Sequence, residues 1–130
     1  MTADYIRNWI IKADNDIKII EHELELPESE WITDVICFHC QQAAEKYMKV
    51  LLIYDNKDIP KTHNIEFLQS LLKENHPDLS ALDVKDISLF GVDVRYPDNF
   101  YQPTIDEVKY YTSLVFRIKE LVLKRIPDYL

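Results

Sequence analysis

Three polar side chains recur at helical spacing in the first half of the chain: His39, Gln42 and Lys46. Their spacing of three and then four residues places them on one face of a helix. An imidazole, an amide and an ammonium group on one face can together line a ligand-binding cleft, because a lysine there needs a partner or a route to solvent. The other interpretation is that His39 is a core imidazole bonded to a neighbouring side chain, which is the commoner role.

A second candidate group consists of Arg95, Tyr96 and Asp98, in a segment that two prolines mark as an irregular loop. A planar guanidinium group suits phosphate, and an aromatic ring can stack on a base. These residues therefore indicate an anion or nucleotide contact. An internal Arg–Asp link that pins the loop explains the same residues equally well.

Cys37, His39 and Cys40 resemble metal ligands, but a structural zinc site needs four ligands and the chain has no second cysteine pair. We therefore interpret both cysteines as small buried apolar residues and expect neither a metal nor another cofactor.

No nucleophile carries a local activation signature, since no strand–turn–helix elbow surrounds any serine. The acidic pairs Asp14/Asp16 and Asp83/Asp86 are interpreted as solvated helix faces rather than acid–base pairs. The sequence thus assigns no catalytic residue.

Composition excludes several function classes. The chain has one glycine, Gly91, whereas phosphate-cradling loops need several glycines to bring backbone N–H groups close to the anion. A P-loop, a dinucleotide fingerprint and a nucleotidyltransferase loop are therefore all excluded. The formal net charge is -8, with 23 acidic and 15 basic side chains, which disfavours broad nucleic-acid binding.

Hydrophobic periodicity predicts a series of helices that would position these groups. Thr2 is expected to cap the first helix, which ends at Pro27, and Ser29 to cap the second, over residues 30–55. Thr62 is expected to cap the third, which His76-Pro77 stops, and a weaker helical stretch follows over residues 79–90. The last helix is expected to start at a capping box over residues 104–107 and to end at Pro127. The predicted fold class is all-α, an up-and-down bundle of four to five helices.

Residues 1–130 are expected to form a single domain, since the length suits one domain and leaves no room for a second. No apolar stretch approaches the ~20 residues of a membrane span, and charged residues interrupt the N-terminal segment where a signal peptide would be apolar. The expected location is the cytoplasm, without membrane contact.

Three segments resemble the HEPN domain family. They are residues 38–49, with the sequence FHCQQAAEKYMK, His63 before a leucine-rich helix, and residues 95–98, RYPD, before a capped final helix. Their order and spacing cover nearly the whole chain and make the resemblance fairly specific.

The resemblance implies a helical bundle that is commonly a homodimer and that associates with a nucleotide or RNA. It also implies a partner, a separately encoded minimal nucleotidyltransferase. The two proteins would form a toxin–antitoxin type of pair in which the bundle is the substrate-binding subunit. The ligand-binding residues indicated are His39, Gln42, Lys46, His63, Arg95, Tyr96 and Asp98.

The chain departs from the ribonuclease members of this family, which carry an arginine and then, after four to six residues, a histidine. After Arg95 those positions hold Phe100, Tyr101 and Gln102. We therefore expect a non-catalytic nucleotide- or partner-binding protein. The alternatives are an atypical ribonuclease that uses Arg95, Asp98 and Tyr101, and a purely structural helical scaffold.

Overall fold

The computed structural model describes residues 3–91 and 101–130, and these residues form helices and turns without a β-strand. The α-helices are α1 (Ala3–Leu24), α2 (Thr33–Tyr54), α3 (Ile65–Leu72), α4 (Pro77–Ser80) and α5 (Ile105–Leu123). Among the described residues, three short 3-10 helices accompany them, η1 (Glu28–Glu30), η2 (Ile87–Phe90) and η5 (Pro127–Tyr129). The predicted all-α bundle is confirmed.

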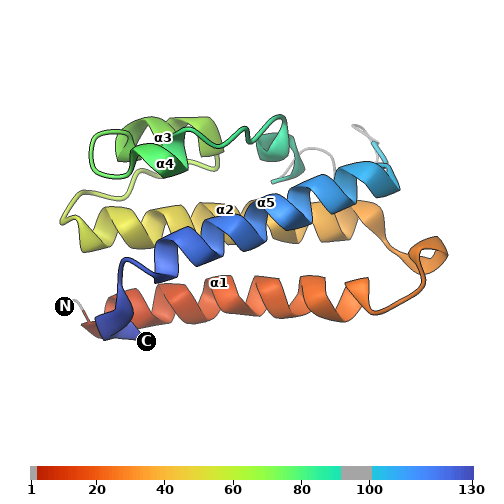
Figure 1. Ribbon diagram of the computed structural model, residues 1–130, viewed down its shortest axis with the longest axis horizontal. Coiled ribbons are helices and arrows are strands. Elements are labelled where there is room, and N and C mark those ends of the chain that lie inside the picture. Colours follow the sequence, from red (N-terminus) through yellow and green to blue (C-terminus); the bar gives the residue numbers. More distant parts are fainter. Residues whose placement is uncertain (1–2, 92–100) are drawn as a thin grey trace.

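Helix α2 is the centre of the bundle, with α1 along one side, α5 across it and the α3–α4 pair on the other side (Figure 1). Large side chains such as Ile36, Tyr47 and Leu51 are fully or almost fully buried on its inner sides. Between Ile36 and Val50 only four α2 side chains are partly exposed: Phe38, His39, Gln42 and Lys46. Their shared face is therefore the part of the central helix that solvent or a ligand can reach.

Helix α2 begins three residues later than the sequence suggests. Residues Glu28–Glu30 form η1 instead, and Ser29 caps nothing; the N-cap is Ile32, which provides no side-chain hydrogen bond. Side chains hold this connection in place: the Trp31 indole donates to the Leu26 carbonyl at 2.9 Å, and the Ile32 amide donates to Glu23 at 3.2 Å. The prediction that Ser29 caps this helix was wrong because the cap site lies beyond a 3-10 turn that periodicity does not detect.

The cap of the third helix is Asn64 rather than Thr62. The Asn64 side chain accepts from the Phe67 amide at 2.9 Å, while the Thr62 hydroxyl accepts from the amide of Asn64 itself at 3.1 Å. Both residues are good N-cap types. The sequence assignment was off by two positions because their local signals overlap.

The weak helical stretch over residues 79–90 is interrupted. Lys85 has a φ of 46°, a left-handed conformation that cannot continue an α-helix, and its amide bonds to the Asp83 carboxylate at 3.0 Å. The stretch therefore divides into the end of α4 and the separate η2, which packs on α2.

The capping box at the start of α5 is confirmed. The Thr104 hydroxyl accepts from the Glu107 amide at 3.1 Å, and the Glu107 carboxylate accepts from the Thr104 amide at 3.0 Å. This reciprocal pair fixes the start of the helix that covers α2. Across the described residues, no helix is both long enough and apolar enough to cross a membrane.

The free energies of unfolding of two variants test whether Asn64 or Thr62 caps α3. We expect Asn64→Ala to lower the free energy of unfolding by about 1 kcal/mol, because it removes the acceptor for the Phe67 amide. Thr62→Ala should lower it by less than half as much. Urea denaturation of the two variants decides the matter, and a larger loss for Thr62→Ala would contradict the observed cap.

Candidate functional site

A row of polar side chains, here called the α2 polar face, runs along the central helix on and beside its exposed side. Its members are His39, Gln41, Gln42, Glu45, Lys46 and Lys49. Several of them are buried, so each charged or hydrogen-bonding group there requires a partner. The partners divide the face into two clusters, one around Asp16 and one around Glu45.

Asp16 of α1 joins two of the side chains that the sequence singled out. Its carboxylate accepts from His39 Nδ1 at 2.8 Å through one oxygen and from Lys46 Nζ at 2.6 Å through the other. Asp16 is only 6% exposed. The interpretation of Asp16 as part of a solvated face was therefore wrong, since this carboxylate is buried and fixes the position of Lys46.

Glu45 is the centre of the second cluster. One carboxylate oxygen accepts from Lys49 Nζ at 2.9 Å, and the other from His63 Nδ1 at 2.9 Å and from the Gln41 amide at 3.1 Å. Burial alone would raise the pKa of the Glu45 carboxyl, but these hydrogen bonds and the positive charge of Lys49 outweigh burial. The pKa lies below its usual value, so the carboxylate is ionised at neutral pH.

Gln41 links this cluster to two further segments. Its amide nitrogen donates to the His63 carbonyl at 2.9 Å, and its oxygen accepts from the Gln42 amide at 2.7 Å. The Gln41 side chain also packs against Gly91, where an added Cβ would lie 3.0 Å from Gln41 Cδ. The structure thus brings Gln42 and His63 together through Gln41 and Glu45, two residues that the sequence did not single out.

Three of the site residues predicted from sequence, Arg95, Tyr96 and Asp98, lie outside the residues that the structure describes. After that segment, the Tyr101 hydroxyl donates to the Glu107 carboxylate at 2.6 Å, and this bond raises the pKa of Tyr101 to about 12. The described part of the site is therefore the α2 polar face with its partners.

A groove of about 330 Å³ lies between α1 and α2 beside the Asp16 cluster. We call it the α1–α2 groove; it is lined by Tyr5, Asn8, Trp9, Lys12 and Lys46. The rings of Tyr5 and Trp9 meet edge to face with centroids 6.4 Å apart. The groove therefore combines aromatic surface, an amide and two ammonium groups.

The two lysines of the groove differ in their partners. Lys46 is paired with Asp16, whereas Lys12 is exposed and forms no interaction within residues 3–91 and 101–130. A third ammonium, Lys49 Nζ, lies 5.9 Å from the centre of the Trp9 ring. A negatively charged group entering the groove would meet one free positive charge, Lys12, and one that is already held in place, Lys46, while Lys49 lies over the Trp9 ring outside the lining.

Sequence reasoning missed the α1 side of this groove. Trp9 fits the apolar stripe of the first helix, yet it is partly exposed and faces the lysines of α2. A signal was present, because residues 5, 8, 9, 12 and 16 follow one flank of α1 at helical spacing. That flank could be matched to α2 only once the pairing of the two helices was known.

Both cysteines are fully buried free thiols, as the sequence predicts. Burial raises the pKa of Cys37 to about 12 and that of Cys40 well above its ordinary value, so both thiols are neutral. In the described ranges, no three His, Cys, Asp or Glu side chains are grouped so that they could hold a metal ion.

Comparison with known proteins gives one result that covers nearly the whole chain. A family model described as the HEPN domain matches residues 6–126. The search of curated proteins and the search of solved structures returned no match.

The contact between Gly91 and Gln41 determines whether Gly91→Ala raises or lowers the free energy of unfolding. Gly91 has φ -67° and ψ -44°, which alanine adopts easily, so in open space Gly91→Ala would stabilise the protein. Because the new methyl group would press on Gln41, whose amide is fixed by hydrogen bonds, we expect a loss of about 1 to 3 kcal/mol. Chemical denaturation measures this, and a variant as stable as the wild type would contradict the close packing.

The lowered pKa of Glu45 predicts how stability depends on pH. A carboxyl whose pKa is lower in the folded state stabilises the protein above the unfolded-state pKa and loses that contribution as pH falls through the folded-state pKa. Wild type should therefore exceed Glu45→Gln in stability at neutral pH, and the difference should shrink as pH falls below the ordinary value of 4.5.

Denaturation curves at several pH values measure this difference. Glu25→Gln is the matched control, since Glu25 is exposed and without a partner in the described residues. Its difference from wild type should stay small throughout. A Glu45→Gln difference that is constant with pH would show that the carboxylate is not held as described.

Proposed function

The chain belongs to the HEPN domain family, and from this premise we propose that it is a non-catalytic member that binds a single nucleotide in the α1–α2 groove. The observation that supports this most directly is the composition of the groove. Two aromatic rings, a free lysine and an amide line one space of about 330 Å³ beside the α2 polar face.

The chemistry of the groove suits each part of a nucleotide. A base can stack on the exposed surface of Tyr5 or Trp9. A phosphate can accept from the free ammonium of Lys12 and from Lys46, and the amide of Asn8 can bond to a sugar hydroxyl or a base edge. Asp16 holds Lys46 at the groove, so a ligand does not have to order that side chain on binding.

The charge distribution favours a small ligand over a long nucleic acid. The net charge is -8. Both lysines of the α2 polar face are already paired with carboxylates, Lys46 with Asp16 and Lys49 with Glu45. A chain of phosphates needs an extended basic surface, whereas one nucleotide needs only a local positive site. RNA is therefore the less suitable ligand.

We further propose that the protein is a homodimer and acts in the cytoplasm with a separately encoded minimal nucleotidyltransferase, as one half of a toxin–antitoxin type of pair. With one glycine the chain cannot form a phosphate-cradling loop of its own, so nucleotidyl transfer would be the chemistry of the partner. The acidic charge of the chain also suits a basic partner surface.

Titration calorimetry with ATP and GTP tests the proposed nucleotide site. We expect wild type to bind at least one of them, and Lys12→Gln to weaken binding about tenfold, because it removes a charge-assisted hydrogen bond to phosphate. Lys18→Gln is the matched control: it makes the same change on an exposed position of the same helix, away from the groove. It should change the affinity by about twofold or less.

Two results would contradict the proposal. One is the absence of binding of either nucleotide to wild type. The other is an equal loss of affinity in the two lysine variants, which would indicate a general charge effect rather than a site in the groove.

A further inference from the structure

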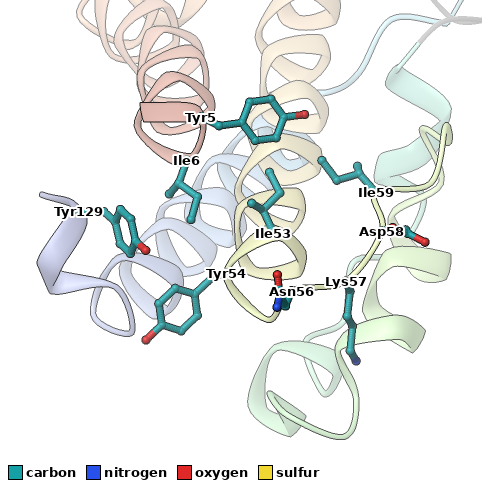
Figure 2. Close-up of a pocket in the computed structure, with 9 residues that line it drawn as sticks. All are labelled: Tyr5, Ile6, Ile53, Tyr54, Asn56, Lys57, Asp58, Ile59 and Tyr129. Carbon is teal, nitrogen blue, oxygen red and sulfur yellow. The ribbon is translucent and has the colours of Figure 1, made fainter. Parts of the chain in front are cut away.

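A second cavity, of about 400 Å³, lies at the end of the bundle where α1 begins and α2 ends (Figure 2). We call it the tyrosine cavity, because three tyrosines from three elements line it: Tyr5 of α1, Tyr54 of α2 and Tyr129 of η5. Tyr5 is 40% exposed and Tyr54 44% exposed. Such exposed aromatic surface offers ring faces to a ligand.

The turn after α2 shapes the floor of this cavity. Asn56 has a φ of 64°, the left-handed conformation that ends many helices, and the Lys57 amide then bonds back to the Leu52 carbonyl at 2.9 Å. The Lys57 ammonium donates to the Leu71 carbonyl at 3.2 Å, and Figure 2 shows this side chain extending away from the tyrosines. Lys57 is the only lysine or arginine among the residues that line the cavity, and its ammonium is directed at the Leu71 carbonyl rather than at the tyrosines.

The remaining charges favour a cation. Asp58, at the rim, is exposed and has no partner among the described residues; in Figure 2 its carboxylate points outward, so it contributes charge rather than a direct contact. The α2 carbonyl end carries the negative end of the helix dipole, and the whole chain has a net charge of -8. The negative charge at this rim therefore favours a cationic ligand over an anionic one.

The Tyr129 ring already contacts one cation, Arg7, which lines a neighbouring pocket together with Tyr129 rather than the tyrosine cavity itself. The guanidinium carbon of Arg7 lies 5.9 Å from the centre of the Tyr129 ring, and Arg7 is in turn 3.7 Å from the Asp4 carboxylate. The rings of Tyr54 and Tyr129 meet edge to face at 6.0 Å and 87°. This arrangement exposes ring surface on which a second planar cation can stack.

We propose that the tyrosine cavity binds an alkyl guanidinium group, such as the side chain of an arginine residue. A guanidinium is planar and more weakly hydrated than an ammonium, so it stacks on tyrosine while keeping its edge donors for the tyrosine hydroxyls or the Asn56 amide oxygen. The isoleucines Ile6, Ile53 and Ile59 line the same space and suit the aliphatic stem. This site is separate from the proposed nucleotide site and has the opposite charge preference, although both use Tyr5.

The test is an NMR titration of the ¹⁵N-labelled full chain with N-acetyl-arginine methylamide. Its neutral isostere, the corresponding citrulline compound, serves as the ligand control. We expect saturable shifts for the arginine compound at the amides around Tyr5, Tyr54 and Asn56, and weaker or no shifts for citrulline. Agmatine distinguishes the source: tighter binding of the capped residue indicates an arginine of a partner protein, and tighter binding of agmatine indicates a free small molecule.

Two variants locate the site, and both positions are exposed, so neither should prevent folding. Tyr54→Leu should weaken arginine binding about two- to fivefold by removing a ring face, and Asp58→Asn about twofold by removing a nearby charge. Glu74→Gln, an exposed carboxylate outside the cavity lining, should leave the affinity unchanged.

Equal shifts with the arginine and citrulline compounds would overturn the proposal, as would equal affinity in wild type and Tyr54→Leu. The Lys12→Gln variant separates the two sites. It should retain arginine binding even where it loses nucleotide binding, so failure of one proposal does not carry over to the other.

Discussion

Each buried charged side chain of the central helix needs a partner of opposite charge, and this requirement fixes the arrangement of its polar face. Helix α2 is enclosed by α1, α5 and the α3 side of the bundle, yet it carries two lysines and a glutamate in or near its buried zone. A buried charge without a partner is strongly destabilising, so Asp16 must hold Lys46 and Glu45 must hold Lys49. The same two carboxylates orient His39 and His63. The contacts of the α2 polar face are thus contacts that folding itself requires.

This constraint explains why the two cavities differ although they share Tyr5. Beside the α1–α2 groove, the carboxylates of Asp16 and Glu45 are already occupied by lysines and histidines, and Lys12 adds a positive charge that no carboxylate of the described residues neutralises. At the end of the bundle Lys57 is turned toward the Leu71 carbonyl, and Asp58 has no partner within residues 3–91 and 101–130. One helix–helix junction therefore separates a site suited to anions from a site suited to cations.

Local signals in the sequence were sufficient where one segment determines its own structure. The Thr104–Glu107 capping box lies within a single turn and was predicted correctly. Helical spacing also placed His39, Gln42 and Lys46 on one face of α2, but that this face is the partly exposed one became clear only from the structure. Ser29 and Thr62 were assigned as caps that the chain does not use, because a 3-10 turn and a better-placed Asn64 competed with them. Asp16 was not recognised, since its role depends on a pairing between helices that no local pattern encodes.

Mapping backbone and side-chain NMR shifts during an ATP titration would show whether the α1–α2 groove binds a nucleotide. We expect the largest shifts at the Asn8 and Trp9 side chains and at the amides near Lys12 and Lys46, which line the groove. Shifts that concentrate around α3 and α4, or that are absent at saturating ATP, would contradict the proposed nucleotide site.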